Sequence, residues 1–180
     1  MTLSRRFLMP STRSIFTMRP ARPPLPALAG WIVFTFLFAA IGAYASAEAG
    51  SFYLQLRRPD WAPPPWLFGP AWTALYLLMS IAVWRVAGVR GWRAAGGALV
   101  LYCVQLVANA LWTWLFFVWH RGLLASGDIV VLLLLIGATA VAFRRHDRLA
   151  AVLLLPYLAW VAFACALSVT IWRMNPGVLH

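Results

Sequence analysis

Five long apolar runs most constrain what this chain can fold into. They cover residues 30–47, 70–87, 94–119, 123–143 and 149–172. The hydrocarbon core of a bilayer is about 30 Å thick, and a helix of about 20 apolar residues spans it. The sequence therefore predicts an all-α fold, an integral membrane bundle of five transmembrane helices. Asp128, near the start of the fourth run, is the one acid inside a predicted span.

The composition agrees with a membrane protein. Hydrophobic residues make up 63% of the chain, charged residues make up 11%, and the mean hydropathy is +0.80. All fifteen basic residues are arginines, and the net charge of +11 would in principle suit a nucleic acid. These arginines flank the apolar runs, however, where membrane topology accounts for them. We therefore predict no nucleic-acid partner and expect membrane lipid, through its acidic headgroups, to balance the charge.

The arginines are divided unevenly between the two sides of the predicted spans. Eleven of them lie in residues 1–29, 85–93 and 144–148, and only four lie on the opposite side. Cytoplasmic loops carry the excess of positive charge in membrane proteins. We therefore expect the N-terminus in the cytoplasm, and the C-terminus and the loop 48–69 on the outer side of a membrane, most simply a bacterial one.

Residues 1–29 differ in composition from the rest of the chain. They contain five arginines, five prolines and no acid. This pattern predicts a basic, Pro-rich, disordered arm ahead of a single transmembrane domain over residues 30–180. An organelle transit peptide has the same Arg-rich, acid-free character and stays open as an alternative. A regulatory partner protein would be expected to bind this arm.

Polar and aromatic residues recur at helical spacing on three of the predicted spans. The steps of three and four residues place each set on a single helix face. The sets are Trp72 and Tyr76 on the second span, Tyr102, Gln105, Asn109, Trp112 and Phe116 on the third, and Tyr157, Trp160 and Ala164 on the fifth. Buried amides need partners, so the third span must turn this face into the bundle. The amides then act either as hydrogen bonds between helices or as ligand contacts, and the aromatic rings either pack the core or line a pocket for a flat, apolar ligand.

A loop rich in Pro and Trp precedes the second span. Trp61 and Trp66 lie between prolines that stiffen the backbone, and Trp72 begins the helical stripe. Proline fixes φ, so rings on such a segment are held out at low entropic cost. We interpret the segment as a hinge that joins the cover of a pocket to its wall. Pro156 in the fifth span either opens a kink beside Tyr157 or is simply a proline of the kind that membrane helices tolerate.

Groups that carry acid–base or metal chemistry are absent from the centres of the spans. No Asp, Glu, Lys, Arg or His lies near a predicted midplane, and Cys103 and Cys165 lie inside apolar runs. Proton relays, catalysis by carboxylates, a disulfide and a haem held by a buried histidine are therefore not expected. We predict no metal site and no required cofactor.

Three ordered motifs on three different spans carry a resemblance to a known family. They are Pro59-x-Trp61-x-Pro63-Pro64-x-Trp66-x-Phe68-Gly69-Pro70-x-Trp72, Gln105-Leu106-x-x-Asn109-x-x-Trp112, and Pro156-Tyr157-Leu158-Ala159-Trp160 followed by Trp172-Arg173-x-Asn175. The chain resembles the tryptophan-rich sensory protein / translocator protein family (TspO/MBR family), also called the peripheral benzodiazepine receptor family. The resemblance implies a five-helix bundle, commonly dimeric, whose first loop covers a cavity for porphyrins, sterols and benzodiazepine-type ligands.

The resemblance also assigns roles to individual residues. It implies that Trp72 and Trp160 line the cavity and take part in porphyrin binding and in light-dependent porphyrin breakdown, and that Asn109 and Trp112 are further cavity positions. This chain has Ser168 where the family usually has Asn, and it lacks the tyrosine of the animal members' sterol motif near Arg173. We therefore expect a tetrapyrrole, as in bacterial members, and not cholesterol.

The leading hypothesis is a membrane protein that binds a metal-free porphyrin and has a role in tetrapyrrole or stress regulation. The residues expected to bind the ligand are Trp61, Trp66, Trp72, Tyr76, Gln105, Asn109, Trp112, Tyr157, Trp160, Ala164 and Ser168. Arg57, Arg58 and Arg121 either pair with the propionates or are plain flanking charge. A light-dependent porphyrin-degrading enzyme, with Trp72 and Trp160 as its reactive residues, and a tetrapyrrole transporter are the alternatives. Small residues at 94–98 make a homodimer the expected assembly.

Overall fold

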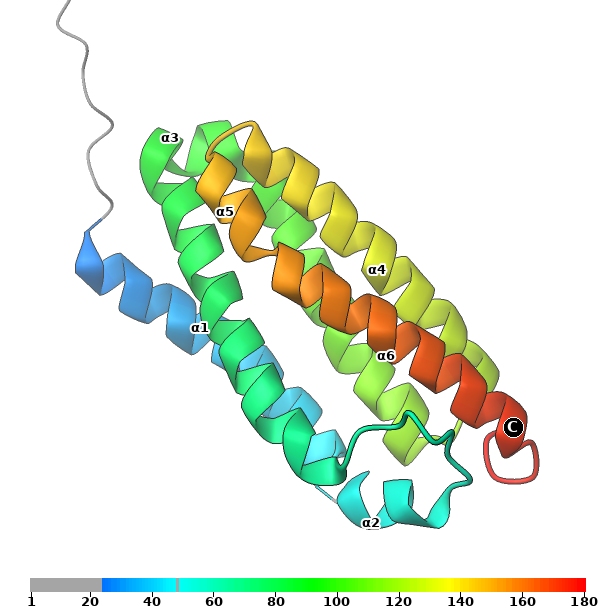
Figure 1. Ribbon diagram of the computed structural model, residues 1–180. Helices are drawn as coiled ribbons and strands as arrows, with labels where there is room; N and C mark the ends of the chain where they lie inside the picture. The colour runs from blue at the N-terminus through cyan, green and yellow to red at the C-terminus, as the bar shows by residue number, and fades with distance from the viewer. Residues whose placement is uncertain (1–23, 48) are drawn as a thin grey trace, which may run out of the picture.

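The computed structural model describes residues 24–47 and 49–180, and every regular element in this part of the chain is helical. The elements are α1 (Leu25–Ala45), α2 (Ala49–Gln55), η1 (Pro65–Leu67), α3 (Phe68–Thr113), η2 (Trp114–Val118), α4 (Gly122–Arg144), α5 (Arg148–Leu153) and α6 (Leu155–Met174). They form an elongated bundle (Figure 1). Five stretches within it are long and apolar enough to cross a bilayer, which confirms the predicted all-α membrane fold. The predicted arm lies mostly outside the described residues.

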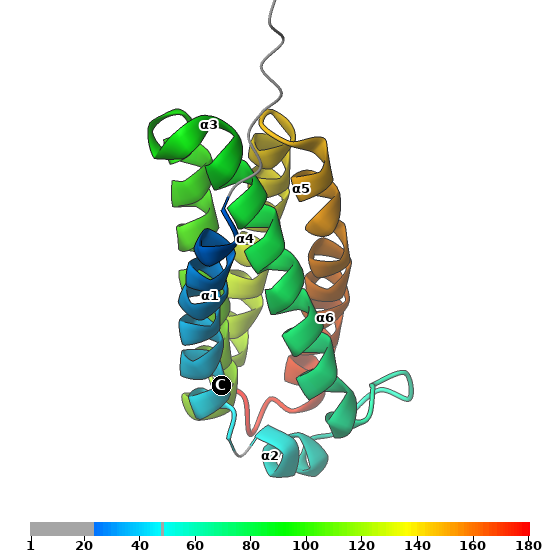
Figure 2. The same cartoon turned by 90° about the vertical axis from the view of Figure 1, so that its left-hand side faces the viewer.

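Helix α3 supplies two of these spans because it folds back on itself. A straight helix of 46 residues would be about 70 Å long. The Tyr76 hydroxyl nevertheless lies 2.5 Å from Oδ1 of Asn109, which is 33 residues further along. The two membrane-crossing stretches are residues 65–88 and 95–118, here called the first and second arms of α3. Figures 1 and 2 show the reversal between them at one end of the bundle.

The first span begins earlier than the sequence pattern suggested. We expected residue 30, but α1 begins at Leu25, directly after Pro24, which has extended backbone angles. Pro26 falls in the first turn of the helix, where a backbone N–H would have no helical partner. Pro24 and Pro26 therefore lie at the start of this helix, although we expected them in the disordered N-terminal arm, residues 1–29.

The last span is broken beside Pro156. Helix α5 ends at Leu153, Leu154 is in a turn, and α6 begins at Leu155. Proline has no N–H to continue the ladder of the preceding turn, and its ring excludes a straight helix there. The kink that the sequence left open is therefore present, and Tyr157 is fully buried just after it.

The two ends of the bundle differ. One end carries α2 and the loop 56–64, and we call it the lid end; the other carries the reversal of α3 and the connection from α4 to α5, and we call it the hairpin end (Figure 1). At the hairpin end, Arg85 forms a 2.7 Å ion pair with Asp147. Asp147 also caps α5 by accepting the Leu149 N–H at 2.8 Å.

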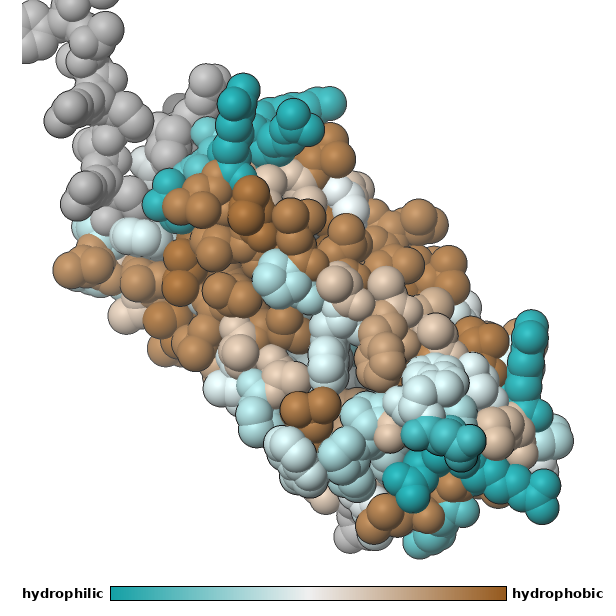
Figure 3. Space-filling view, in the orientation of Figure 1, coloured by the Kyte–Doolittle hydropathy of each residue, from teal (hydrophilic) through white to brown (hydrophobic). Residues whose placement is uncertain are grey.

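The surface between these two ends is largely apolar. In the view of Figure 3, hydrophilic residues gather at the two ends and hydrophobic residues cover most of the length between them. Large apolar side chains that remain exposed occur on every long helix, for example Val33, Val107 and Leu134. A soluble protein does not expose apolar surface on this scale, whereas a bilayer accommodates it.

Candidate functional site

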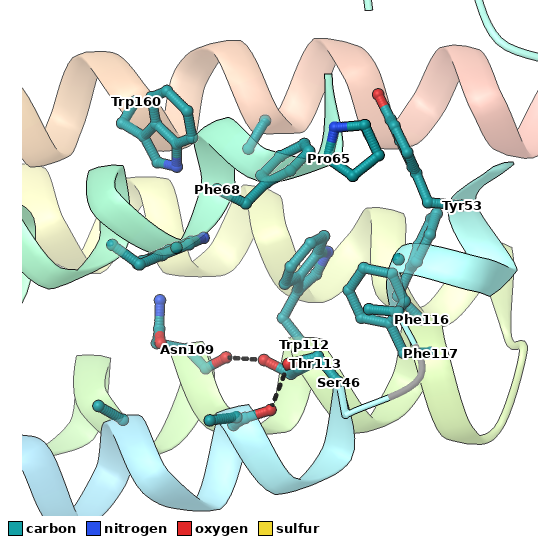
Figure 4. A pocket seen from close by; sticks show the side chains of 18 of the residues that line it. Ser46, Tyr53, Pro65, Phe68, Asn109, Trp112, Thr113, Phe116, Phe117 and Trp160 are labelled. Atoms are coloured by element: carbon teal, nitrogen blue, oxygen red, sulfur yellow. Dashed lines mark hydrogen bonds between the residues drawn. The ribbon is translucent and has the colours of Figure 1, made fainter. Parts of the chain in front are cut away.

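A cavity of about 580 Å³ occupies the lid end of the bundle. Its volume lies in the usual range of small-molecule sites. Its walls come from α1, α2, both arms of α3 with η1 and η2, and α6 (Figure 4). Most of the lining is aromatic or small and apolar, so the cavity favours a flat, apolar ligand.

The cavity brings together the three stripes that the sequence predicted. Seven of the predicted ligand-binding residues line it, namely Trp72, Tyr76, Asn109, Trp112, Trp160, Ala164 and Ser168. They come from the first arm of α3, the second arm of α3 and α6, which lie far apart in the sequence. The shared helical spacing was the signal that placed them on facing surfaces.

Aromatic contacts fix the orientation of the rings in the wall. The centroids of Trp72 and Tyr76 are 5.6 Å apart with an interplanar angle of 31°. Trp112 stacks on Phe116 at 5.6 Å, and Phe68 meets Trp160 edge to face at 6.1 Å. Offset and edge-to-face arrangements of this kind are favourable. The rings are therefore held in place before any ligand binds.

Asn109 ties the cavity wall to the core by hydrogen bonds. Its Oδ1 accepts a hydrogen bond from the Tyr76 hydroxyl at 2.5 Å, and its Nδ2 donates to the Tyr157 hydroxyl at 3.1 Å. The backbone carbonyl of Asn109 accepts from the Thr113 hydroxyl at 3.2 Å. The side-chain amide thus joins both arms of α3 to α6, which is the first of the two roles left open by the sequence, and Asn109 also lines the cavity.

Gln105 lies one turn earlier on the same stripe but does not line the cavity. It is 1% exposed, and neither of its amide atoms has a hydrogen-bond partner among the described residues. Tyr157 is also outside the lining, although its ring lies 6.2 Å from that of Trp72 and its hydroxyl contacts Asn109. Both residues support the wall from behind.

The two tryptophans of the loop also lie outside the lining. Trp66 is 71% exposed, and Trp61 is 49% exposed and packs edge to face on Phe163 of α6 at 5.7 Å. Trp61 thus fastens the loop to the flank of α6, and Trp66 points away from the protein. The role of these residues in ligand binding stays a prediction.

None of the three arginines proposed as propionate contacts lines the cavity. The Arg58 guanidinium lies 4.9 Å above the Tyr53 ring. Arg57 is exposed and its main chain is engaged with Asn175, while Arg121 occupies the N-cap of α4. Any contact of their side chains with a ligand would lie at the edge of the cavity.

The wall supplied by α1 was not foreseen from the sequence. It consists of Phe36, Ala39, Ala40, Gly42, Ala43 and Ser46. The small residues at 39, 40, 42 and 43 were the only signal, and small residues in a membrane helix equally indicate close helix packing. At Gly42 the approach is tight, since a Cβ atom there would lie 3.3 Å from the Thr113 hydroxyl oxygen.

The cavity reaches the surface on the side between α1 and the first arm of α3. Four of its lining residues there are exposed, Ala40 and Ala43 on α1 and Gly69 and Thr73 on α3. All four belong to apolar membrane-spanning segments. A ligand dissolved in the bilayer would meet this side first.

Hydrogen bonds from the Asn175 side chain hold the lid, which consists of α2 and the loop 56–64, over the cavity. Its Oδ1 accepts the backbone N–H of Arg57 at 2.8 Å, and its Nδ2 donates to the Arg57 carbonyl at 2.9 Å and to the Ile171 carbonyl at 2.8 Å. The side-chain amide therefore pairs with the loop as a neighbouring backbone strand would. Asn175 belongs to one of the sequence motifs, but nothing in the motif connects it with residue 57.

Tyr53 joins α2 to the same lid. Its hydroxyl donates to the Pro63 carbonyl at 3.1 Å, and its ring packs edge to face on Phe68. Burial raises the pKa of the Tyr53 hydroxyl, and the nearby Arg58 guanidinium offsets part of that rise. The hydroxyl therefore stays protonated and able to donate at neutral pH.

None of the described lining residues of the cavity is charged at neutral pH, because none of them is Asp, Glu, Lys, Arg or His. Within the described residues no cluster of His, Cys, Asp or Glu could hold a metal ion. The arrangement can enclose and orient an apolar ring system, and it offers no acid–base pair to a substrate.

Comparisons with known proteins give the family context. A sequence model of the TspO/MBR family matches residues 31–173. The chain is 44% identical to "Protein CrtK" of Rhodobacter capsulatus over 131 residues, which cover 71% of this chain and 81% of that protein. It is 41% identical to the "Tryptophan-rich sensory protein" of Cereibacter sphaeroides over 149 residues (81% of this chain, 92% of that protein). It is 36% identical to the human "Translocator protein" over 169 residues (87% and 94%).

Proposed function

The chain belongs to the TspO/MBR family of membrane proteins, and on this premise we propose that its lid-end cavity binds a flat tetrapyrrole such as a metal-free porphyrin. The observation that carries the proposal is the cavity itself. Its volume is about 580 Å³, its described lining residues are uncharged, and aromatic rings from four membrane-spanning segments wall it. A large planar ring gains most from walls of this kind, because each aromatic contact adds to the burial of apolar surface.

Three tryptophans give the proposal its testable residues. Trp72, Trp112 and Trp160 line the cavity from the first arm of α3, the second arm of α3 and α6. A ring ligand placed between these segments would contact indole rings that are already oriented by their neighbours. Preorganised contacts of this kind contribute to affinity at little entropic cost.

The side opening between α1 and α3 supports an apolar ligand over a polar one. The lid is latched at Asn175, whereas the exposed lining residues Ala43 and Thr73 lie on membrane-spanning segments. Porphyrins partition into bilayers, so a ligand of this class would reach the cavity from the lipid phase without opening the lid.

A titration of protoporphyrin IX into the detergent-solubilised protein, followed by the Soret absorbance of the porphyrin, tests the proposal. We expect saturable binding, and we expect Trp72→Ala and Trp160→Ala each to weaken it by about tenfold, since aromatic stacking contacts are worth about 1–3 kcal/mol. Trp66→Ala is the matched control, because Trp66 lies outside the lining and should leave the affinity unchanged. Equal affinities in all four proteins would refute the proposal.

A second candidate function is the light-dependent oxidation of the bound porphyrin. Trp72 and Trp160 line the cavity, and none of its described lining residues is an acid–base group. A reaction there would therefore need light, molecular oxygen as the oxidant and an oxidisable side chain. Illumination in air should bleach the Soret band of the bound porphyrin faster than that of the same porphyrin in detergent alone. Trp72→Phe and Trp160→Phe should slow the bleaching while keeping the porphyrin bound, and unchanged bleaching in both would dispose of this candidate.

A further inference from the structure

A second, smaller cavity adjoins the first one at the lid end. Its volume is about 280 Å³, and its lining residues are Ala45, Ala49, Ser51, Phe52, Gln55, Phe117 and His120. Ala49 and Phe117 line both cavities, so the two spaces lie next to each other with these residues between them. The second cavity is therefore the space nearest to this side of a ring system bound in the first.

The backbone holds His120 at this cavity in an uncommon conformation. The π-helical turn Trp114–Val118 precedes it, and the N–H of Arg121 reaches back to the Leu115 carbonyl at 2.8 Å. The φ of His120 is 52°, in the left-handed region that residues other than glycine seldom adopt. Both π-helical turns and left-handed residues occur often at functional sites.

The imidazole is oriented but keeps its nitrogens free. It stacks on the Phe52 ring with a centroid distance of 4.5 Å and an interplanar angle of 29°. No hydrogen bond to either ring nitrogen occurs within the described part of the chain. The stack occupies one face of the ring and leaves its edge available, and an imidazole provides one N–H donor when neutral and two when protonated.

The polar lining favours an acceptor and not a cation. The amide of Gln55, at the exposed end of α2, adds two N–H donors to those of His120. Among the described residues that line this cavity, none is acidic. The described lining of the larger cavity, by contrast, offers no residue that is charged at neutral pH. A ligand with an apolar ring and a carboxylate side chain thus finds complementary surroundings for each part in adjoining spaces.

We propose that His120 and Gln55 form a carboxylate subsite that receives an acidic side chain of the ligand whose rings occupy the larger cavity. The proposal rests on the proposed function, and it assigns the propionates of a tetrapyrrole to this place. The arginines that the sequence suggested for this role line neither cavity. His120 was set aside in the sequence because it follows a span, and only the fold brings it beside Phe52 and Phe117.

The test compares protoporphyrin IX with its dimethyl ester, which has the same ring and no carboxylate. Soret titrations of both probes are made with the wild-type protein, with Gln55→Leu and with His120→Gly, which keeps a residue suited to positive φ. Trp119→Phe is the matched control, because it neighbours His120 and lies outside the lining. The change in affinity on mutation is compared between the two probes, so the different partitioning of acid and ester into detergent cancels.

We expect each variant to weaken the binding of the acid by about tenfold or more, the size expected for a lost hydrogen bond to a charged group, and to leave the affinity for the ester within about twofold. Equal losses for acid and ester, or no loss for either, would overturn the subsite while leaving the ring site intact. Loss of the acid's affinity in Arg57→Ala with Arg58→Ala, but not in His120→Gly or Gln55→Leu, would also overturn it and return the role to the arginines. If neither probe binds the wild-type protein, the proposed function fails and the subsite fails with it.

A last measurement distinguishes a carboxylate attached to the ring ligand from a free carboxylate. Sodium propionate alone should not bind measurably, because a free ion lacks the effective concentration that attachment to a bound ring provides. Tight binding of propionate to the protein without porphyrin, lost in His120→Gly, would mean that the subsite serves a small free acid and would overturn its assignment to the ring ligand.

Discussion

The hairpin-end half and the lid-end half of this bundle are built from the same helices but are packed in opposite ways. Towards the hairpin end, large side chains such as Met79, Tyr102, Phe143 and Leu154 are fully buried and fill the interior. Towards the lid end, the same helices surround a cavity of about 580 Å³. Stability and binding are therefore expected to depend on different halves, and substitutions can separate the two properties.

The difference begins with side-chain size at facing positions. In the hairpin half, Tyr102 meets Phe143 in a stack with a centroid distance of 6.1 Å, and its hydroxyl lies 2.7 Å from Oγ1 of Thr35 on α1. In the lid half, the side chains that α1 contributes to the cavity wall are small except for Phe36, namely Ala39, Ala40 and Ala43 together with Gly42. Small residues on one helix opposite aromatic residues on the others thus leave room for a ligand, and the lid then covers the space.

The largest expected effect on stability is in the hairpin half. Phe143→Ala removes a ring that is 0% exposed and should lower the free energy of unfolding by about 3 kcal/mol or more, because the packed neighbours cannot refill the space. Unfolding in mixed micelles monitored by circular dichroism measures it. Val141→Ala, at a side chain that is 59% exposed, should change the stability little. Equal destabilisation by both variants would show that the hairpin half is not the tightly packed one.

Gly122 tests whether the lid half is loose throughout or only around the cavity. A Cβ atom there would lie 2.1 Å from Cδ1 of Trp172 and 2.9 Å from Cβ of Leu179. Gly122→Ala should therefore destabilise the protein by about 1–3 kcal/mol through overpacking. Gly127→Ala, where nothing lies within 4 Å, is the matched control and should be neutral. If Gly122→Ala were also neutral, the end of α6 would be more loosely held than the contacts indicate.

Asn175 tests the closure of the lid. Asn175→Ala removes the two hydrogen bonds to Arg57 and the one to the Ile171 carbonyl. The expected loss of about 1–3 kcal/mol should appear locally, as faster amide hydrogen exchange in residues 56–64, and not as a lower stability of the whole bundle. Asn175→Asp keeps the acceptor for the Arg57 N–H but sets a carboxylate oxygen against the Arg57 and Ile171 carbonyls, so it should speed the exchange at least as much as Asn175→Ala. Unaltered exchange in both variants would show that other contacts close the lid.

A smaller effect is expected from Tyr53 and from alkaline pH. Tyr53→Phe removes the bond to the Pro63 carbonyl and should speed the same local exchange, by an amount that corresponds to about 1 kcal/mol. The pKa of Tyr53 is raised by burial, so its contribution is present below the ordinary tyrosine pKa and is lost as pH rises through the higher pKa of the folded state. Wild-type lid protection should therefore fall at strongly alkaline pH, and that fall should be absent in Tyr53→Phe.

The smallest effect is expected at the partly exposed ion pair of the hairpin end. The Arg85 and Asp147 side chains are 34% and 11% exposed. Arg85→Met should cost no more than about 1 kcal/mol, since solvent screens such a pair. A larger loss would show that this pair, and not the buried rings alone, organises the hairpin half.

The sequence was most informative where side chains repeat at helical spacing. The aromatic and polar stripes on residues 72–76, 109–112 and 160–164 predicted the helix faces and six of the residues that line the cavity, and the family resemblance added Ser168. The length of the apolar runs predicted the five spans, because the bilayer sets a minimum length for each.

Other features depend on contacts between distant parts of the chain and had no local signal. The wall of α1 consists mostly of small residues, whose pattern does not distinguish a cavity from close packing. The pairing of Asn175 with Arg57 spans 118 residues. Trp61 and Trp66 lie in the same Pro- and Trp-rich segment as Trp72. Trp66 nevertheless lies in η1, directly before α3, and its side chain is at the surface.

The dimer expected from residues 94–98 stays a prediction. Ala95 and Ala98 are buried within the single chain, and Gly97 is exposed. The side chain of Ala94 is not described. Small residues favour close helix approach inside a bundle as well as between subunits, so their presence alone did not decide between the two.

We propose that the ring ligand binds in the cavity of the lid half. A structure of the protein with bound protoporphyrin IX tests this proposal. We expect the porphyrin ring to lie between Trp72, Trp112 and Trp160, beneath the closed lid. A ring bound instead against the apolar outer surface of the helices, with the cavity unoccupied, would contradict it.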